Sequence, residues 1–287
     1  MIRIHAVWWI ACLLWSGGWL FIKVGLSDLP PLTFAALRLM LAFVVLAAIV
    51  AARREWAELN RRDLPIIAVS GVLLLGVNYA LTFWGAQYLP SALTSVLQAT
   101  SPAFGFLIGI TTGAERFSLA RGLALPLGIA GVALISSARF GDGTLAGWAS
   151  VAVVSGAACA ALAYALTKRR SMHLPPTVMV AMQTLFAMVP LLATALVVDG
   201  NPLAHRWTTS AIVALLYLAI ASSVVAFWLN YWLLKRVSAT MVLSMALVQP
   251  LVAAALGAIV LGERFGMSAA VGGGLILTSA AVILRRE

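Results

Sequence analysis

The sequence predicts an all-α integral membrane protein in which ten transmembrane helices form two inverted five-helix repeats. Composition is the first reason: 63% of the residues are hydrophobic and only 10% are charged, whereas a soluble domain is typically about a quarter charged. The charged residues are also bunched, so long stretches between them carry none. An internal sequence repeat is the third observation. Composition alone already excludes a water-soluble fold.

The apolar stretches set the positions of the predicted helices. A helix that crosses the hydrocarbon core needs roughly 20 mainly apolar residues, so the charge-free run 64–114 holds two, separated near Pro90. The first stretch follows Arg3, but it is longer and more aromatic than the core of a signal peptide, so it is interpreted as the first helix. In chain order the helices are predicted near residues 4–26, 31–52, 64–86, 90–112, 119–137, 146–168, 175–197, 209–232, 238–261 and 267–284.

The basic residues predict how the chain is oriented. A net charge of +10 would suggest nucleic-acid binding in a soluble protein. With the N-terminus inside, however, most Lys and Arg residues fall on cytoplasmic segments, as the positive-inside rule requires. Both termini are therefore predicted to be cytoplasmic, and no nucleic-acid partner is expected. The cytoplasmic basic residues are then Arg3, Arg53, Arg54, Arg61, Arg62, Arg116, Arg121, Lys168, Arg169, Arg170, Lys235, Arg236, Arg285 and Arg286.

Motifs for catalysis or metal binding are missing from the sequence. Cys12 and Cys159 both lie in apolar segments, which gives neither a disulfide framework nor a metal-type spacing. There is no H-E-x-x-H, G-x-S-x-G or phosphate-binding glycine loop, and the run 272–274 of three glycines is interpreted as helix packing. The sequence therefore predicts no enzyme activity, no metal and no cofactor.

The two halves of the chain repeat one another. The segment 102–117 aligns without gaps on 250–265, so that Glu115 matches Glu263 at an offset of 148 residues. Lys23 matches Lys168 at an offset of 145 residues. Because each half holds an odd number of helices, the halves enter the membrane from opposite sides. The repeats are predicted to be 1–142 and 143–287. Such inverted repeats are typical of alternating-access transporters with a site near the midplane, although channels and scramblases also have them.

Polar and aromatic residues inside the spans are the candidates for a substrate site. Gln98 is mid-helix, where an unpaired amide is costly, so it faces either a cavity or a partner helix, and both interpretations are equally supported. Among the tryptophans, Trp15 is the best candidate because it lies mid-span beside Ser16-Gly17-Gly18. Amide groups with aromatic faces suit a zwitterionic or aromatic metabolite. The candidates from the spans are Trp15, Asn78, Tyr79, Gln98, Ser155, Tyr164, Gln183 and Ser244.

Two prolines are predicted as helix hinges. Pro102 and Pro250 occupy equivalent positions in the two repeats, and each removes one backbone hydrogen bond from its helix. The freed carbonyls could bind substrate or permit bending, although a simple kink would account for a bend by itself.

Ionisable residues inside spans are functional candidates by default. Lys23, near the end of the first helix, is expected to extend its ammonium group to the membrane surface. Arg38 lies well inside the second helix, so its charge needs either a substrate carboxylate or a structural partner such as Glu263. No Asp or Glu lies in the middle of a span, which favours facilitated or exchange transport over ion coupling.

The element Leu261-Gly262-Glu263, with its echo at Glu115, resembles the EamA family of the drug/metabolite transporter superfamily, and within it the YddG-type amino-acid exporters. The resemblance extends from Trp8 to Leu284, although the first copy departs from the element in reading Gly113-Ala114-Glu115. It implies a bacterial inner-membrane exporter whose helices surround a central cavity. It supports Trp15, Tyr79, Gln98, Ser155, Tyr164 and Ser244 as lining residues and adds Trp228.

The predicted function is a secondary transporter that exports aromatic and other neutral amino acids by alternating access. One alternative is an exporter of another small metabolite or a drug, although a drug carrier would more often keep a buried acid. Another is a channel-like or scramblase-like protein without alternating access. The expected partners are a small-molecule substrate and the lipid bilayer, and the sequence is compatible with a monomer.

Overall fold

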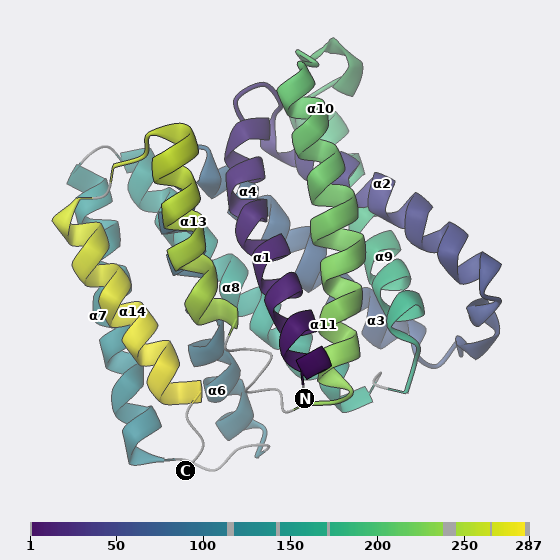
Figure 1. Ribbon diagram of the computed structural model, residues 1–287, viewed down its shortest axis with the longest axis horizontal. Coiled ribbons are helices and arrows are strands. Elements are labelled where there is room, and N and C mark those ends of the chain that lie inside the picture. The colour runs from purple at the N-terminus through teal and green to yellow at the C-terminus, as the bar shows by residue number, and fades with distance from the viewer. Residues whose placement is uncertain are drawn as a thin grey trace.

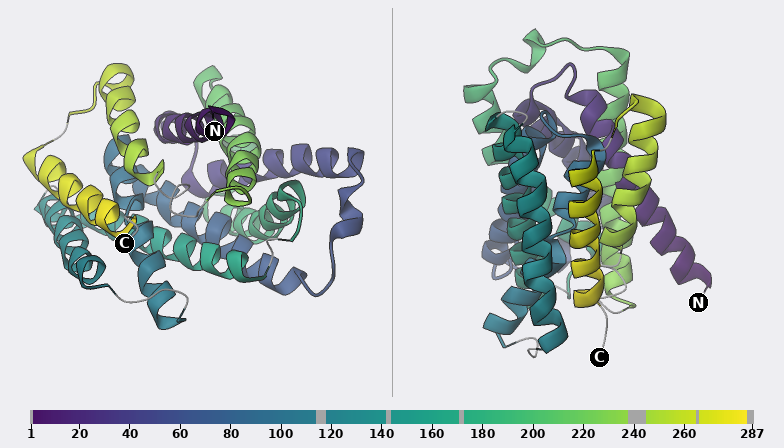
Figure 2. Two further views of the ribbon diagram at one scale, coloured as in Figure 1. Left: turned by 60° about the horizontal axis from the view of Figure 1, so that its bottom comes forward. Right: turned by 90° about the vertical axis from the view of Figure 1, so that its left-hand side faces the viewer.

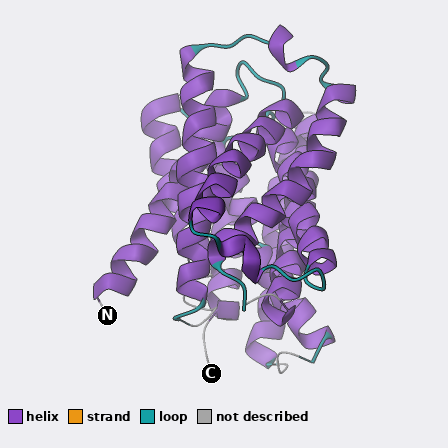
Figure 3. Ribbon diagram, turned by 90° about the vertical axis from the view of Figure 1, so that its right-hand side faces the viewer, coloured by secondary structure: helices purple, strands orange, loops and turns teal. Residues whose placement is uncertain are grey.

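The computed structural model describes residues 2–113, 118–141, 144–170, 173–237, 245–264 and 266–284. Within these ranges the chain is helical, with no strand, which agrees with the predicted all-α class. The helices form a bundle, and α1 begins at the same end at which α14 finishes (Figures 1 and 3). We call this end of the bundle the terminal end, and the opposite end, where α1 finishes at Gly25, the Lys23 end.

The helices follow the apolar stretches of the sequence. Short non-α turns connect or interrupt several of them. In chain order the elements are α1 (Ile2–Gly25), α2 (Pro31–Ala52), η1 (Glu55–Glu58), α3 (Leu64–Gly71), η2 (Val72–Val77), α4 (Asn78–Ala86), α5 (Ser91–Gln98), α6 (Ser101–Thr111), α7 (Leu119–Gly141), α8 (Thr144–Arg170), α9 (Pro176–Val198), η3 (Pro202–Ala204), α10 (Thr209–Leu216), η4 (Tyr217–Val225), α11 (Ala226–Leu234), α13 (Met245–Leu261) and α14 (Met267–Leu284).

Seven helical segments of the described chain are long and apolar enough to cross a membrane. They correspond to seven of the predicted spans, with ends that differ by a few residues. Three further apolar helices are shorter, at Gly122–Ile135, Met245–Leu261 and Met267–Val282, and these correspond to the predicted spans 119–137, 238–261 and 267–284. A crossing by these three, and hence the count of ten, stays a prediction.

Helices from the two halves of the chain pack against each other. α2 lies against α9, α4 against α8, α1 against α11 and α13, and α7 against α14 (Figures 1 and 2). α7 and α14 approach closely at Gly131 and Gly272, where a Cβ added to Gly131 would lie 2.6 Å from the carbonyl oxygen of Gly272. Small residues allow such backbone approach in membrane helices, so the packing interpretation of the run 272–274 holds for Gly272, whereas Gly274 has no described atom within 4 Å of its Cβ position.

Two of the long helices contain π-helical segments at matching places. The segment η2 lies between α3 and α4, and η4 lies between α10 and α11. At the offset of 148 residues, η2 falls on positions 220–225 within η4. π-helical turns often occur at functional sites, so the two segments draw attention to the side chains on and around them.

The two predicted hinge prolines have different surroundings. Pro102 follows a break between α5 and α6, where Ala99 and Thr100 leave the α-helix. Pro250 lies inside α13, which continues through it. Only the first proline therefore accompanies an interruption of its helix, and a hinge motion at either residue stays a prediction.

Candidate functional site

Arg38 lies in a buried polar cluster between α2, α4 and η4. Its side chain is 3% exposed, Nε donates to Ser223 Oγ at 2.9 Å, and Nη2 donates to Ser222 Oγ at 3.1 Å. The guanidinium carbon lies 4.5 Å from the ring centroid of Tyr79, within cation–π range. We call Arg38, Tyr79, Ser222 and Ser223 the arginine cluster. Tyr79 was predicted from the sequence as a site residue, and in the structure its ring lies against the guanidinium group of Arg38.

Helix α1 binds the same turn of η4. Trp15 Nε1 donates to the carbonyl oxygen of Ser222 at 3.1 Å. Its ring packs edge-on against the ring of Phe227, with 5.3 Å between the two ring centroids. Gly18 permits the approach, because a Cβ there would lie 3.2 Å from Ser222 Oγ. The predicted residue Trp15 therefore lies beside the arginine cluster.

Gln98 joins α5 to α4 and α8 through its side-chain amide. Nε2 donates to Asn78 Oδ1 at 2.8 Å and to Thr82 Oγ1 at 2.5 Å, and it lies 3.5 Å from the carbonyl oxygen of Val153. Asn78 in turn donates to Leu74. We call Asn78, Thr82 and Gln98 the amide cluster. Of the two interpretations of Gln98, the cross-helix bond is present, while the side chain remains half-buried.

Gln183 is the centre of a third cluster, which the protein buries completely. Its side chain is 1% exposed, and Nε2 donates to Ser70 Oγ at 2.9 Å and to Thr167 Oγ1 at 3.1 Å. The Tyr231 hydroxyl donates to Gln183 Oε1 at 2.9 Å. This neutral cluster connects α9 to α3, α8 and α11, and Gln183 corresponds to Arg38 at the offset of 145 residues.

Tyr164 connects the Arg38 and Gln183 regions. Its hydroxyl interacts with Asn230 and lies close to Tyr79 and Tyr231. Asn230 is 2% exposed, yet its Nδ2 has no hydrogen-bond acceptor among the described residues. Buried amide donors are normally paired, so Asn230 is an exception beside a predicted site residue.

The remaining predicted residues lie elsewhere. Trp228 packs with the apolar residues that join α1, α11 and α13. Ser155 is exposed, and its hydroxyl donates to Val151 in its own helix at 2.9 Å, so it joins none of the three clusters. Ser244 lies outside the described residues.

Lys23 and Glu263 hold the helix connections at the Lys23 end of the bundle. Lys23 Nζ donates to the carbonyl oxygens of Ala86, Gln87 and Leu89 at 2.9, 3.1 and 2.9 Å. Glu263 accepts from the backbone N–H and the hydroxyl of Ser91 at 2.8 and 2.7 Å. We call Lys23, Ser91, Glu263 and these carbonyls the clasp.

The clasp bears on two expectations from the sequence. The ammonium group of Lys23 binds carbonyl oxygens of Ala86, Gln87 and Leu89, and its extension to the membrane surface stays a prediction. Glu263 is engaged with Ser91 and is not the partner of Arg38. The sequence could not distinguish these cases because the fold, not helix position alone, decides which residues meet.

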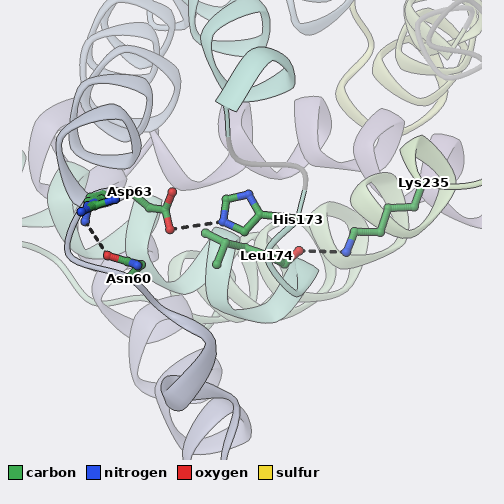
Figure 4. A network of polar contacts seen from close by, with 6 residues as sticks. Asn60, Asp63, His173, Leu174 and Lys235 are labelled. Carbon is green, nitrogen blue, oxygen red and sulfur yellow. Dashed lines mark hydrogen bonds and ion pairs between the residues drawn. The ribbon is translucent and has the colours of Figure 1, made fainter.

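Contacts at the terminal end join three connections of the chain. His173 lies 3.2 Å from Asp63, and Lys235 Nζ donates to the carbonyl oxygen of Leu174 at 2.9 Å (Figure 4). Asn60 accepts from the backbone of the α2–α3 connection in the same region. Among the described residues no group of His, Cys, Asp or Glu side chains could hold a metal ion.

A comparison with family models decides what kind of protein carries these clusters. The model of the EamA-like transporter family matches the chain twice, at residues 4–137 and 147–285. The chain belongs to the EamA-like transporter family. It is therefore a multi-pass membrane protein of a family of transporters, as the resemblance had implied.

Relatives from bacteria and archaea match nearly the whole chain of this EamA-like transporter. An uncharacterized transporter of Archaeoglobus fulgidus is 30% identical, with 98% of this chain and 96% of the relative covered. The uncharacterized transporter YoaV of Bacillus subtilis is 27% identical, with 92% of this chain and 90% of the relative covered. A probable amino-acid metabolite efflux pump of Escherichia coli is 26% identical, with 94% of this chain and 90% of the relative covered.

A solved crystal structure has the same fold as this EamA-like transporter. The two share 20% sequence identity with a TM-score of 0.68, and the match covers 98% of this chain and 96% of the other. At this identity the likeness concerns the fold alone.

The sequence-based set of site residues missed several members of the clusters. Arg38 was recognised as a buried charge but not included, and Ser222, Ser223 and Asn230 were not singled out. Each is a polar residue within an apolar span, which is itself a signal that could have found them. Trp19 and Gln249, whose side chains meet at 3.4 Å, were also left out of the set.

Proposed function

We propose that this EamA-like transporter is a secondary carrier that exports amino acids across the inner membrane by alternating access. The substrate class is supported by the similarity to the Escherichia coli protein described as a probable amino-acid metabolite efflux pump. It also fits the polar and aromatic groups of the arginine and amide clusters, because a zwitterion with an apolar side chain needs both kinds of contact.

The asymmetry of the clasp is the observation that carries the proposal. Lys23 is bonded to three carbonyls, whereas its counterpart Lys168 is exposed and makes no hydrogen bond or ion pair with the described residues. In an inverted repeat the two halves exchange conformations between the two states of the carrier. A state in which Lys23 is bonded while the described part of the chain leaves Lys168 unbonded is what such a carrier adopts when the Lys23 end is shut. Glu115, the counterpart of Glu263, lies outside the described residues.

The orientation follows from the charges. Arg53, Arg54, Arg61, Arg62, Lys235 and Arg236 belong to the connections at the terminal end, and the positive-inside rule assigns such connections to the cytoplasm. The Lys23 end then faces the exterior, so the described conformation is shut toward the exterior. Both termini and the boundaries of the repeats, 1–142 and 143–287, are proposed on the same basis. Inner-membrane residence is supported by a relative described as an inner membrane transporter.

Counterflow in proteoliposomes tests this function. Vesicles are loaded with an unlabelled amino acid, and labelled tryptophan, methionine or threonine is presented outside. A carrier is expected to accumulate label transiently and to saturate with concentration. Uptake that stays linear with concentration would indicate the channel-like alternative. No counterflow with any amino acid by folded protein would assign the carrier to another metabolite or a drug.

A further inference from the structure

We propose that Arg38 is the substrate-binding cation of this carrier and that, with Tyr79 and Asn230, it binds a carboxylate group of the transported solute. The proposal rests on the proposed function and deepens it. It restricts the substrates to acids and zwitterions and assigns the group that recognises them.

The positive charge of Arg38 has no counter-ion among the described residues. Its two bonded partners, Ser222 and Ser223, are neutral hydroxyls. A guanidinium has more N–H donors than these two bonds use. An isolated charge in a low-dielectric interior is costly, and an entering carboxylate would offset that cost. The described carboxylates that make contacts bond elsewhere in the fold, and these are Asp28, Glu55, Asp63, Asp199 and Glu263.

A second buried donor without an acceptor lies in the same region. Asn230 Nδ2 completes no hydrogen bond with the described residues, although it faces the Tyr164 hydroxyl, and Tyr164 lies close to Tyr79. Tyr79 itself contacts Arg38. The region therefore offers both a cation and an amide donor to an acceptor that the described chain does not supply. A carboxylate, which accepts several hydrogen bonds, matches that demand.

The second half of the chain shows that packing does not require a charge here. Gln183 corresponds to Arg38, and a neutral amide joins its helices with every side-chain group paired to Ser70, Thr167 or Tyr231. The same position in the first half carries a cation that has hydroxyl and aromatic neighbours but no counter-ion among the described residues. A role in recognition accounts for this difference, whereas a purely structural role would be met by an amide.

Binding by three related probes tests the subsite. The probes are tryptophan, tryptamine, which lacks the carboxylate, and indole-3-propionate, which lacks the amine. Dissociation constants are measured on purified wild-type protein and on Arg38→Gln. The wild type is expected to bind both carboxylates at least about tenfold more tightly than tryptamine, and Arg38→Gln is expected to lose that preference, because the loss of a buried charge partner typically weakens binding by this much or more.

Two further variants keep the test decisive. Gly131→Ala overpacks the contact between α7 and α14, and it is expected to lower thermal stability while leaving the preference for carboxylates unchanged. If Arg38→Gln does not fold, the variant Ser222→Ala with Ser223→Ala keeps the cation and removes only its two hydroxyl partners. It is expected to change the affinity for tryptophan and to leave that for tryptamine unaltered.

The outcomes separate this inference from the carrier function. Equal affinity of the wild type for tryptophan and tryptamine, no binding of either carboxylate, or an unchanged preference in Arg38→Gln would overturn the subsite. Saturable counterflow by the wild type would still uphold the carrier in each of these cases. Absence of counterflow would instead remove the carrier function, whatever the binding measurements give.

Discussion

Glu263 accepts two hydrogen bonds from Ser91, one from the backbone N–H at 2.8 Å and one from the hydroxyl at 2.7 Å. Ser91 is the first residue of α5, so the carboxylate caps a helix that lies far away in sequence. Gly257 makes room for the contact, because a Cβ there would lie 2.3 Å from Glu263 Oε2. The segment after α13 is thereby attached to the start of α5.

Glu263→Gln should weaken this cap. An amide can still accept from one donor, but it loses the negative charge that favours a helix N-terminus, so a loss of about 1 kcal/mol is expected. The measurement is the melting temperature of the purified protein in detergent. Glu58→Gln, on a short helix away from the clasp, is the control. An equal shift in the two variants would contradict the capping role.

Lys23→Met removes the cation from three carbonyl oxygens and should lower the rate of counterflow, since the clasp can no longer shut the Lys23 end. The sharper prediction concerns Lys168→Met. Lys168 has no partner among the described residues, so a protein with one conformation would tolerate this change, whereas an alternating carrier would lose a contact of its other state.

Initial rates of counterflow measure both effects, with protein amounts matched. Lys235→Met, which removes a contact to Leu174 at the terminal end, shows how much any lost lysine contact matters. Normal rates in Lys168→Met would count against the exchange of conformations between the two halves.

Gln98→Ala should lower both stability and transport. It leaves Asn78 Oδ1 with one donor fewer and removes the connection from α5 to α4 and α8, and a typical hydrogen bond contributes roughly 0.5–1.5 kcal/mol net. Thermal unfolding and counterflow of labelled tryptophan measure the two effects. Thr111→Ala, an exposed residue bonded within its own helix, is the control. A melting temperature equal to that of the control would show that the amide cluster does not stabilise the bundle.

Gly131→Ala should separate α7 from α14. The new Cβ would lie 2.6 Å from the carbonyl oxygen of Gly272, a backbone atom that cannot move aside easily, and overpacking of this kind typically costs about 1–3 kcal/mol. Gly274→Ala on α14 is the matched control, because no described atom lies within 4 Å of its Cβ position. Similar melting temperatures for the two variants would contradict the close approach.

Several elements could be predicted from the sequence because the bilayer imposes them locally. An apolar stretch such as Pro31–Ala52 has to be helical, since backbone groups in hydrocarbon need partners within the same segment. The π-helical turns were not predicted, because π-helical and α-helical residues have the same apolar composition. Nor did the sequence predict the break at Ala99 and Thr100 as two separate helices, although Pro102 marked its place.

The sequence by itself determined that the chain is helical and apolar enough for a membrane, that its halves are related, and that Arg38 carries a charge in need of a partner. Each of these follows from composition or from a comparison of the chain with itself. Only the tertiary structure decided that Ser222 and Ser223 bind Arg38, that Glu263 binds Ser91, and that Gln98 reaches α4 and α8. Such contacts join residues far apart in sequence, and they depend on how the helices are rotated and packed, which local hydrophobicity does not specify.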